Sequence, residues 1–277
     1  SEADVMPLEP EPEPEADPDE ELSLEELADL NDYPTVRRGR ESLRRLTRGE
    51  FKRAIRALFG DEIMVPKISE PDVEREGLRA VGASFLTYSP RGVESVEQAT
   101  YDVATQALAT DELRQRLVSC TPEGAVDDAC ALATLSPLAQ RAWRRPVQPA
   151  ELESYVAIAR VAGQTLESFW GGLEYGIAAI LQSPEFLFRV ELALDELQSD
   201  REDEDDPDDT GDRPLSAWEL AARLSFFLWS APPDEALSTV AIDQSLLERD
   251  VLFAQAKRMM DDPRFNVGLR ALFDDHL

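Results

Sequence analysis

Hydrophobic residues recur at helical spacing through most of the chain beyond about residue 43. Phe51, Ile55 and Leu58 lie three or four positions apart, which places apolar side chains on one face of a helix. This pattern predicts helices at 47–59, 96–109, 111–118, 125–143, 149–162, 166–182, 184–197, 216–229, 245–261 and 263–275. The sequence lacks runs of alternating β-branched residues and Asn-Gly or Asp-Gly turns, the usual signals of hairpins. We therefore predict an all-α, multi-helix globular body with one irregular connection at about 60–95.

Short sequence signals mark the helix starts. Some are Ser/Thr-x-x-Glu/Gln capping boxes, in which the hydroxyl and the acidic or amide side chain each accept a backbone N–H. Others place a cap residue directly before a proline, which suits the first helical position. The six signals begin at Thr47, Ser95, Ser183, Ser216, Ser245 and Asp262.

Charge is concentrated in two stretches. The chain has 277 residues and a formal net charge of −29, of which residues 1–32 contribute −14 and residues 195–213 contribute −9. The first stretch is rich in alternating Pro and Glu, so we predict a disordered, solvated tether. The second reads as a surface linker. Each could dock a basic partner, although a solubilising spacer is the simpler interpretation. The acidity argues against nucleic-acid binding, because phosphates would be repelled.

Few residues suit a metal or cofactor. The acidic linker offers oxygen ligands for calcium at Asp203, Asp205 and Asp209, but the spacing and the glutamate of a calcium-binding loop are missing. The single histidine, His276, follows Asp274 and Asp275; it suits either a general base or a residue at a helix C-terminus. C-x-x-C-H, the covalent haem motif, is absent. We expect no cofactor and no metal in this chain.

The two cysteines, Cys120 and Cys130, flank a turn. In an exported protein such a pair is most simply a disulfide. In a reducing compartment they would be ordinary thiols, and a metal pair lacks the further ligands that a tetrahedral site needs.

Candidate chemistry gathers around an arginine cluster, Arg141, Arg144 and Arg145. Its guanidinium groups could clamp a carboxylate or phosphate ligand, or they could cap carbonyl groups and pair with glutamates of neighbouring helices. Glu174 and Glu185 lie among apolar residues, as does Glu191. They are candidates for general acid–base chemistry if their pKa is raised by burial, or for ion pairs with Arg189 and the cluster.

Three sequence blocks carry a family resemblance. They are RRLTRGEF within 43–60, AWRRP followed by GLEYGIAAILQSPEFLFRVE up to residue 191, and RPLSAWELAARLSFFLWSAPP at 213–233. In this order they resemble exported proteins of planctomycetes and myxobacteria, built from the domains of unknown function numbered 1587, 1595 and 1592. The cysteine pair resembles that of the myxobacterial branch.

The resemblance implies a domain organisation. We expect a tether at 1–36, a helical domain at 37–118, a second at 119–198 with the Arg-rich and FLFRVE blocks, an acidic linker at 199–213, and the start of a third domain at 214–277. The third domain would be truncated, so that the chain is a fragment.

The resemblance also implies an extracytoplasmic location: periplasm, outer-membrane tether or cell surface. The sequence contains no run of eighteen apolar residues, which is about the length that a membrane-spanning helix needs. We expect a non-catalytic scaffold or interaction region of a cell-envelope protein, with other envelope proteins or a cytochrome c module as partners. The alternative is the N-terminal part of an extracytoplasmic enzyme that is redox-linked or acts on cell-surface polymers.

Overall fold

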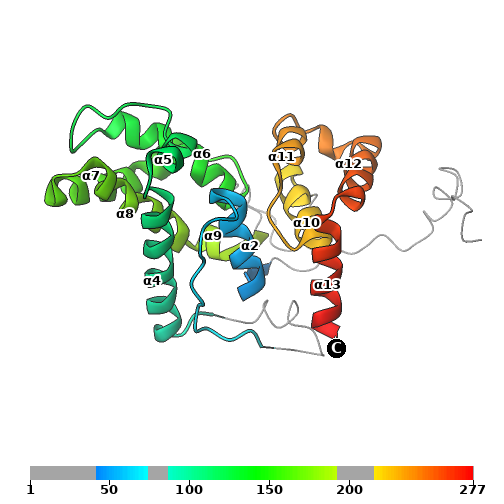
Figure 1. The fold of residues 1–277 in the computed structure, drawn as a ribbon. Coiled ribbons are helices and arrows are strands. Elements are labelled where there is room, and N and C mark those ends of the chain that lie inside the picture. Colours follow the sequence, from blue (N-terminus) through cyan, green and yellow to red (C-terminus); the bar gives the residue numbers. More distant parts are fainter. Residues whose placement is uncertain (1–41, 74–86, 192–214, 277) are drawn as a thin grey trace, which may run out of the picture. The chain divides into compact units, whose positions relative to one another are not determined.

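A computed structural model describes residues 42–73, 87–191 and 215–276 (Figure 1). These residues form eleven α-helices, two short 3₁₀ helices and one two-stranded antiparallel sheet. The prediction of an all-α body is therefore confirmed.

The elements follow one another as β1 (Ser42–Arg45), α2 (Arg48–Phe59), α4 (Pro90–Ala107), α5 (Asp111–Leu117), α6 (Asp128–Trp143), η3 (Pro149–Leu152), α7 (Glu153–Leu166), α8 (Phe169–Gln182), α9 (Pro184–Leu187), β2 (Phe188–Glu191), α10 (Ala217–Trp229), α11 (Glu235–Ile242), η4 (Ser245–Leu247), α12 (Arg249–Asp261) and α13 (Arg264–His276).

One hydrophobic core unites the elements from β1 to β2. The helix α8 lies at its centre, with α4, α6 and α7 packed against it, as Figure 1 shows. Since α8 presents apolar residues on most of its surface, it is buried along much of its length. The largest fully buried side chains of this core include Phe51, Ile55, Leu135, Leu173, Ile177 and Phe186.

Two glycines bring α7 and α8 into close backbone contact. A Cβ atom on Gly172 of α8 would lie 2.8 Å from the Cα atom of Gly163 of α7, and closer still to the carbonyl oxygen of Ala159. A Cβ atom on Gly163 would in turn collide with the carbonyl oxygen of Ala125. Backbone atoms cannot move aside as a flexible side chain can, so these positions accept only glycine at this helix separation.

The sheet corrects the predicted helix at 184–197. The helix α9 ends at Leu187, whose carbonyl oxygen accepts a 2.9 Å hydrogen bond from the amide of Leu46. The chain then pairs as β2 with β1, in the register Leu43 with Val190 and Arg45 with Phe188. The helix thus stops because its next residues hydrogen-bond to a strand far away in the sequence; residues 192–197 lie outside the described part.

The predicted helix starts are confirmed in part. Thr47 and Ser216 form complete capping boxes, and Ser183 caps α9. Ser95 does not start a helix: α4 begins at Pro90 after the cap Ser89, and the Ser95 hydroxyl accepts the amide of Ser69 instead.

The segment before α12 also differs from the prediction. Residues 235–242 form α11, which begins at the cap residue Asp234 and was not expected. The expected box at Ser245 is a 3₁₀ helix, and α12 begins only at Arg249. The helix predicted at 245–261 is shorter at its start, because residues 245–247 form a 3₁₀ helix whose Leu246 is buried in the second core.

The described part of the irregular connection is tied down by two arginines. Arg45 is only 2% exposed, and its Nη2 donates to the carbonyl oxygen of Pro71 at 2.7 Å. Arg48 donates from Nε to the carbonyl oxygen of Glu70 at 2.7 Å. The Asp72 carboxylate accepts the amide of Arg48 at 3.1 Å, at the positive N-terminus of α2. Charge pairing thus orders residues that have no regular structure.

The helices α10 to α13 enclose a second, smaller core. It contains Ala217, Trp218, Ala221, Leu228, Trp229, Leu237, Ala241, Leu246 and Met259. The indole N–H of Trp229 donates to the carbonyl oxygen of Met259 at 2.9 Å. Within the described residues, no helix has the length and apolar composition required to cross a membrane.

The glycine contact between α7 and α8 makes a stability prediction. Replacing a mid-helix glycine by alanine should stabilise an isolated helix by about 1 kcal/mol. We expect Gly172→Ala to lower the free energy of unfolding by about 1–3 kcal/mol instead, since the new methyl group collides with backbone. Urea unfolding followed by tryptophan fluorescence measures this. Gly124→Ala is the control, because no atom lies within 4 Å of its added Cβ; equal midpoints for both variants would contradict the prediction.

Candidate functional site

The arginine cluster lies at the end of α6, where its three side chains diverge. Arg141 donates from Nη2 to the carbonyl oxygens of Ala57 and Leu58 at 2.7 and 3.2 Å. It thereby satisfies carbonyl groups at the C-terminal end of α2 that have no partner within the helix. Arg145 forms a 2.6 Å hydrogen bond with Glu151 and lies over the Trp143 ring. The cluster does not converge on a common ligand position.

Arg144 turns inward because its backbone adopts the left-handed conformation that ends α6, with a φ of 58°. The residue is 6% exposed, and its Nη2 lies 2.6–3.2 Å from the carbonyl oxygens of Glu185, Phe186 and Phe188. Burial, together with the positive charge of Arg189, lowers the pKa of Arg144 to about 9. One guanidinium therefore holds the segment where α9 becomes β2.

Phe226 of α10 links the second helical part to this arginine. The residue is 5% exposed and belongs to the first core, although it is on a helix of the second. The guanidinium carbons of Arg144 and Arg189 lie 5.7 and 4.8 Å from its ring centre, within the range of cation–π attraction. Glu50 supplies a negative charge 3.8 Å from Arg189. We call Arg144, Arg189, Glu50 and Phe226 the arginine junction.

A second contact reinforces the arginine junction. Arg53 of α2 donates from Nε to the carbonyl oxygen of Ser230 at 2.7 Å, and its Nη2 reaches the Ser230 hydroxyl. Ser230 ends α10 in the left-handed conformation. Arginines from three elements of the first core thus contact the end of one helix of the second.

The two candidate glutamates are separate from the cluster side chains. Glu174 is half-buried and accepts a 3.2 Å hydrogen bond from the Thr105 hydroxyl. Glu185 is also half-buried, and Arg144 donates a hydrogen bond to its backbone carbonyl oxygen and not to its carboxylate. Neither lines the pocket beside Arg141, the pocket between α10 and α12 or the pocket beside Arg160. The side chain of Glu191 lies outside the described residues.

One pocket holds two carboxylates that the sequence did not single out. Its volume is about 550 Å³, and Asp128, Glu153 and Arg160 line it together with Leu132 and other apolar residues. Arg160 donates hydrogen bonds to both carboxylate oxygens of Asp128, at 2.6–2.9 Å. This hydrogen bonding raises the pKa of Arg160, so Asp128 serves first as the partner of an arginine.

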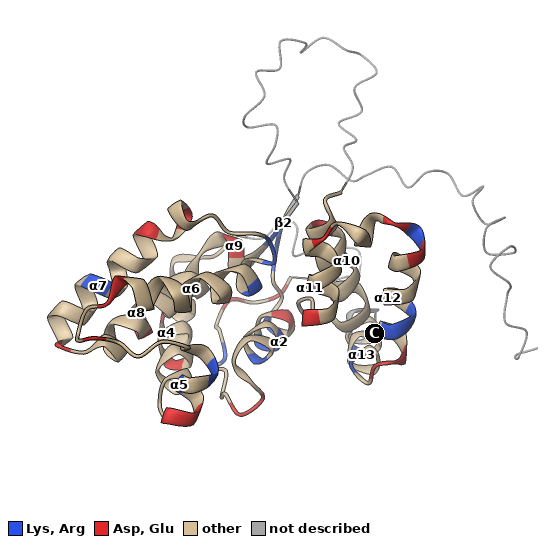
Figure 2. Ribbon diagram, turned by 90° about the horizontal axis from the view of Figure 1, so that it is seen from above, with Lys and Arg blue, Asp and Glu red and all other residues tan. Residues whose placement is uncertain are grey.

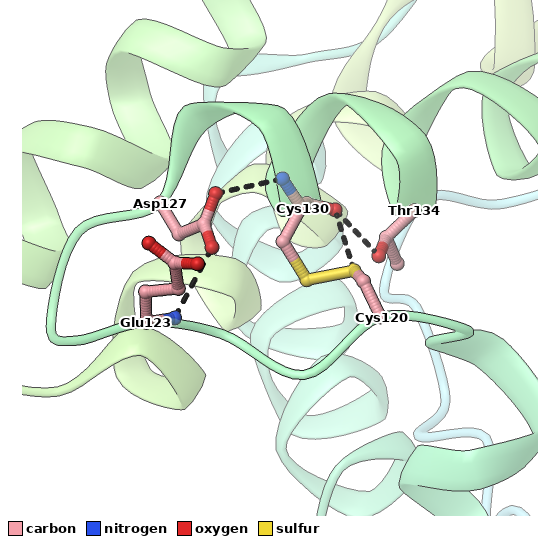
Figure 3. The surroundings of a disulfide bond; sticks show 5 residues. All are labelled: Cys120, Glu123, Asp127, Cys130 and Thr134. Atoms are coloured by element: carbon pink, nitrogen blue, oxygen red, sulfur yellow. Dashed lines mark hydrogen bonds between the residues drawn. A yellow bond between two sulfur atoms is a disulfide. The ribbon is translucent and has the colours of Figure 1, made fainter.

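Cys120 and Cys130 form a disulfide, with Cα atoms 5.7 Å apart (Figure 3). Asp127 caps α6 by accepting the Cys130 amide at 2.9 Å, and its other oxygen accepts the Glu123 amide at 3.2 Å. These backbone hydrogen bonds lower the pKa of Asp127. The predicted disulfide is thus present, and the same short loop is braced a second time by a carboxylate.

The remaining candidates cannot be placed. Asp203, Asp205 and Asp209 lie outside the described residues, as does the side chain of His276, the last residue of α13. The part of the chain that the structure describes contains no group of three or more potential metal ligands.

An ionic network joins α11, α12 and α13; of its residues, only the cap Asp262 was identified from the sequence. Asp234 accepts from Arg258 at 2.9 Å and from Arg264 at 3.0 Å, and Asp262 accepts from Arg264 at 2.7 Å. The Arg264 guanidinium lies 3.5 Å above the Trp229 ring. The hydrogen bond from Arg264 lowers the pKa of Asp262 to about 2. Burial opposes ionisation of Asp234, but hydrogen bonds, first among them those from Arg258, still lower its pKa.

The buried position of Arg144 predicts a large effect of its removal. We expect Arg144→Met to lower the free energy of unfolding by about 3 kcal/mol, because three buried or part-buried carbonyl oxygens lose their charged donor. Relief of the repulsion from Arg189 offsets only part of this loss. Urea unfolding measures the effect. Arg116→Met is the control, because that side chain is 60% exposed; a wild-type midpoint for Arg144→Met would refute the structural role of this arginine.

The ionic network predicts a defined acid sensitivity. The pKa values of Asp234 and Asp262 are lowered from an ordinary value of 3.8. The stability that their ionisation contributes is therefore complete above about pH 4 and is lost as the pH falls toward 2. We expect the protection of α11 to α13 against hydrogen exchange, expressed relative to the intrinsic exchange rate at each pH, to fall over this interval. Asp234→Asn should flatten the profile, whereas Asp111→Asn, at an exposed pair with Arg114, should not; the same profile in both variants would contradict this assignment.

Comparison with known families gives three matches. PSD3: Protein of unknown function (DUF1587) matches residues 44–109, PSD5: Protein of unknown function (DUF1595) matches residues 130–191, and PSD4: Protein of unknown function (DUF1592) matches residues 215–277. Comparison with curated proteins finds no match, and neither does comparison with solved structures. The matches confirm the resemblance seen in the three sequence blocks. Along this chain the matches to DUF1587, DUF1595 and DUF1592 therefore follow one another in this order.

Proposed function

We propose that this chain is a non-catalytic scaffold and interaction region of an exported protein associated with the cell envelope. The observation that carries the proposal is the arginine junction. In this junction the guanidinium of Arg144 donates hydrogen bonds to backbone carbonyl oxygens and lies over the Phe226 ring. A guanidinium used in this way fixes one helical part to another and is not presented to a ligand.

The other members of the cluster support the same conclusion. Arg141 satisfies the end of α2, and Arg145 pairs with Glu151. Arg141 lines one pocket of the described residues, but no Asp or Glu lines it with Arg141. Asp128 and Glu153 line a different pocket, which no arginine of the cluster lines. The cluster stabilises the fold, and the region acts by holding its surfaces in a fixed arrangement.

The disulfide supports the proposed location. Cys120 and Cys130 are linked, and such bonds persist in oxidising compartments such as the periplasm and the cell surface. Other envelope proteins, or a cytochrome c module, are the partners that we propose.

One observation favours the alternative of an extracytoplasmic enzyme acting on cell-surface polymers. Asp128 and Glu153 line the same open pocket, and glycoside hydrolysis uses two carboxylates across a cleft. The hydrogen bonds from Arg160 to Asp128 weigh against it. The proposal of a redox-linked enzyme has no comparable support in the described residues.

Thiol trapping tests the location. We expect the protein, expressed from its own gene, to fractionate with the cell envelope. Cys120 and Cys130 should resist a maleimide reagent until a reductant is added, because the disulfide leaves no thiol to react. A cytosolic protein with both cysteines alkylated before reduction would overturn the proposal.

Cross-linking in the same cells tests the scaffold role. Complexes with envelope proteins should persist in the double variant Glu174→Gln/Glu185→Gln and in Glu153→Gln, because none of these carboxylates is needed to hold a partner. If no complex forms, and the purified protein turns over a polysaccharide in a way that Glu153→Gln abolishes, the enzyme is the correct interpretation.

A further inference from the structure

The helix α5 lies at the first core without burying a single side chain. Four of its seven residues are charged, and Figure 2 shows them in red and blue. A helix this short is not stable by itself in water. In residues 109–127, which connect α4 with α6, the side chain of Val118 alone is buried. We call residues 109–127 the α5 segment. A segment with so few buried contacts opens more easily than the core beneath it.

The α5 segment forms one wall of a pocket of about 230 Å³. Leu113 and Leu117 lie one helical turn apart, on the same face of α5, and both line this pocket. The opposite wall comes from the ends of α2 and α4 and from α6, and consists of Leu58, Phe59, Gly60, Ala107 and Arg141. Leu58 and Phe59 are each 6% exposed. Movement of α5 away from this wall would therefore open the pocket and expose apolar surface.

Few polar contacts attach α5 to the core. Arg114 donates from Nε to the carbonyl oxygen of Leu108 at 2.8 Å, and its guanidinium lies 4.6 Å from the centre of the Trp170 ring. Arg116 pairs with Glu62, but these side chains are 60% and 45% exposed. An ion pair so open to water adds little stability. One arginine and two half-buried leucines thus provide most of the non-covalent attachment.

The disulfide supplies the attachment that is missing. Cys120 follows the end of α5 by three residues and is bonded to Cys130, in the first turn of α6 (Figure 3). An opened α5 segment must still return to α6 at this bond, so it has fewer conformations to gain and the docked state is favoured. Asp127 accepts the amides of Cys130 and Glu123, and this cap holds the start of α6 whether or not the bond is present.

The two sulfur atoms differ in their access to solvent. Cys120 is partly exposed, whereas Cys130 is 4% exposed, so a dithiol reductant meets Cys120 first. A thiolate of the reductant attacks the Cys120 sulfur, the bond to Cys130 breaks, and Cys130 leaves as a thiolate that takes up a proton. The second thiol of the reductant then displaces Cys120. The reductant supplies two electrons and two protons and becomes a disulfide, and the chain gains two thiols.

We propose that α5 is a redox-controlled lid on the pocket between α2, α4 and α6. The disulfide between Cys120 and Cys130 keeps the lid docked, and a dithiol releases it while the core stays folded. The inference goes beyond the proposed function, because the lid would work in the same way on a scaffold and on an enzyme.

Hydrogen exchange of the full 277-residue chain, with and without dithiothreitol, tests the proposal. We expect reduction to accelerate exchange of the α5 amides roughly 30-fold, as the loss of a cross-link over a short loop does. The amides of α8 should stay protected over the same period, because this helix lies at the centre of the core. Binding of the dye anilinonaphthalene sulfonate, which reports exposed apolar surface, should rise on reduction.

Variants separate the lid from a general loss of stability. The double variant Cys120→Ser/Cys130→Ser should exchange like the reduced protein and should not respond to dithiothreitol. Arg114→Gln should accelerate exchange of α5 severalfold with the disulfide intact, because the contacts with Leu108 and Trp170 are lost. Arg91→Gln is its matched control, at an exposed position of α4, and should leave α5 unchanged.

Three results would overturn the proposal. Equal exchange rates of α5 and α8 in the reduced protein would show that the bond stabilises the whole core and governs no lid. Unchanged exchange of α5 after reduction, or faster exchange without a rise in dye binding, would show that the bond does not keep the pocket covered. A disulfide that dithiothreitol reduces only in urea would show that the folded protein withholds it from a reductant.

Discussion

The arrangement of this molecule depends on the burial of one guanidinium. Arg144 is out of contact with water, and desolvation of a charge is costly unless the group is well hydrogen-bonded. Three carbonyl oxygens from α9 and β2 meet this requirement at Nη2, whereas the buried Nη1 has no hydrogen-bond partner among the described residues. The same group lies over Phe226 of α10, so the position of the second helical part follows from how the charge of the first is satisfied. The positive charge of the nearby Arg189 repels that of Arg144, and the negative charge of Glu50 offsets part of this repulsion.

Ion pairs have a different role at the periphery. Asp72 and Glu70 attach an irregular connection to Arg45 and Arg48, and Asp234 and Asp262 connect three helix ends through Arg258 and Arg264. In both places a carboxylate next to a helix N-terminus also meets an arginine. Such groups combine the favourable helix dipole with a charge-assisted hydrogen bond. Most of the acidic excess, by contrast, belongs to residues 1–32 and 195–213.

Local signals predicted much of the fold. The capping boxes at Thr47 and Ser216 need only four consecutive residues, and both formed as expected. The sheet could not be predicted, because each strand has four residues and pairs with a partner about 145 positions away. The start of α4 was missed although Ser89-Pro90 carries the same signal that was used at Ser183-Pro184.

The candidate site was less predictable than the fold. The sequence identified the arginine cluster as exceptional, but it could not distinguish a ligand clamp from internal capping. The partners of Arg141 are 84 and 83 residues away, and those of Arg144 lie on α9 and β2, so tertiary packing alone decides their role. The disulfide was predictable, since its ends are close in the sequence.

Two adjacent phenylalanines give α10 a further property. Phe226 points into the first core and is 5% exposed, whereas Phe227 lines an apolar pocket between α10 and α12 and is 73% exposed. Rolling the helix about its axis would move the Phe226 ring away from Arg144 and Arg189. The outer ring is therefore presented at a fixed angle, and a ligand would have to adapt its own shape to a preformed surface. Such a surface loses little conformational entropy on association, which favours recognition by geometry over recognition by mutual adjustment.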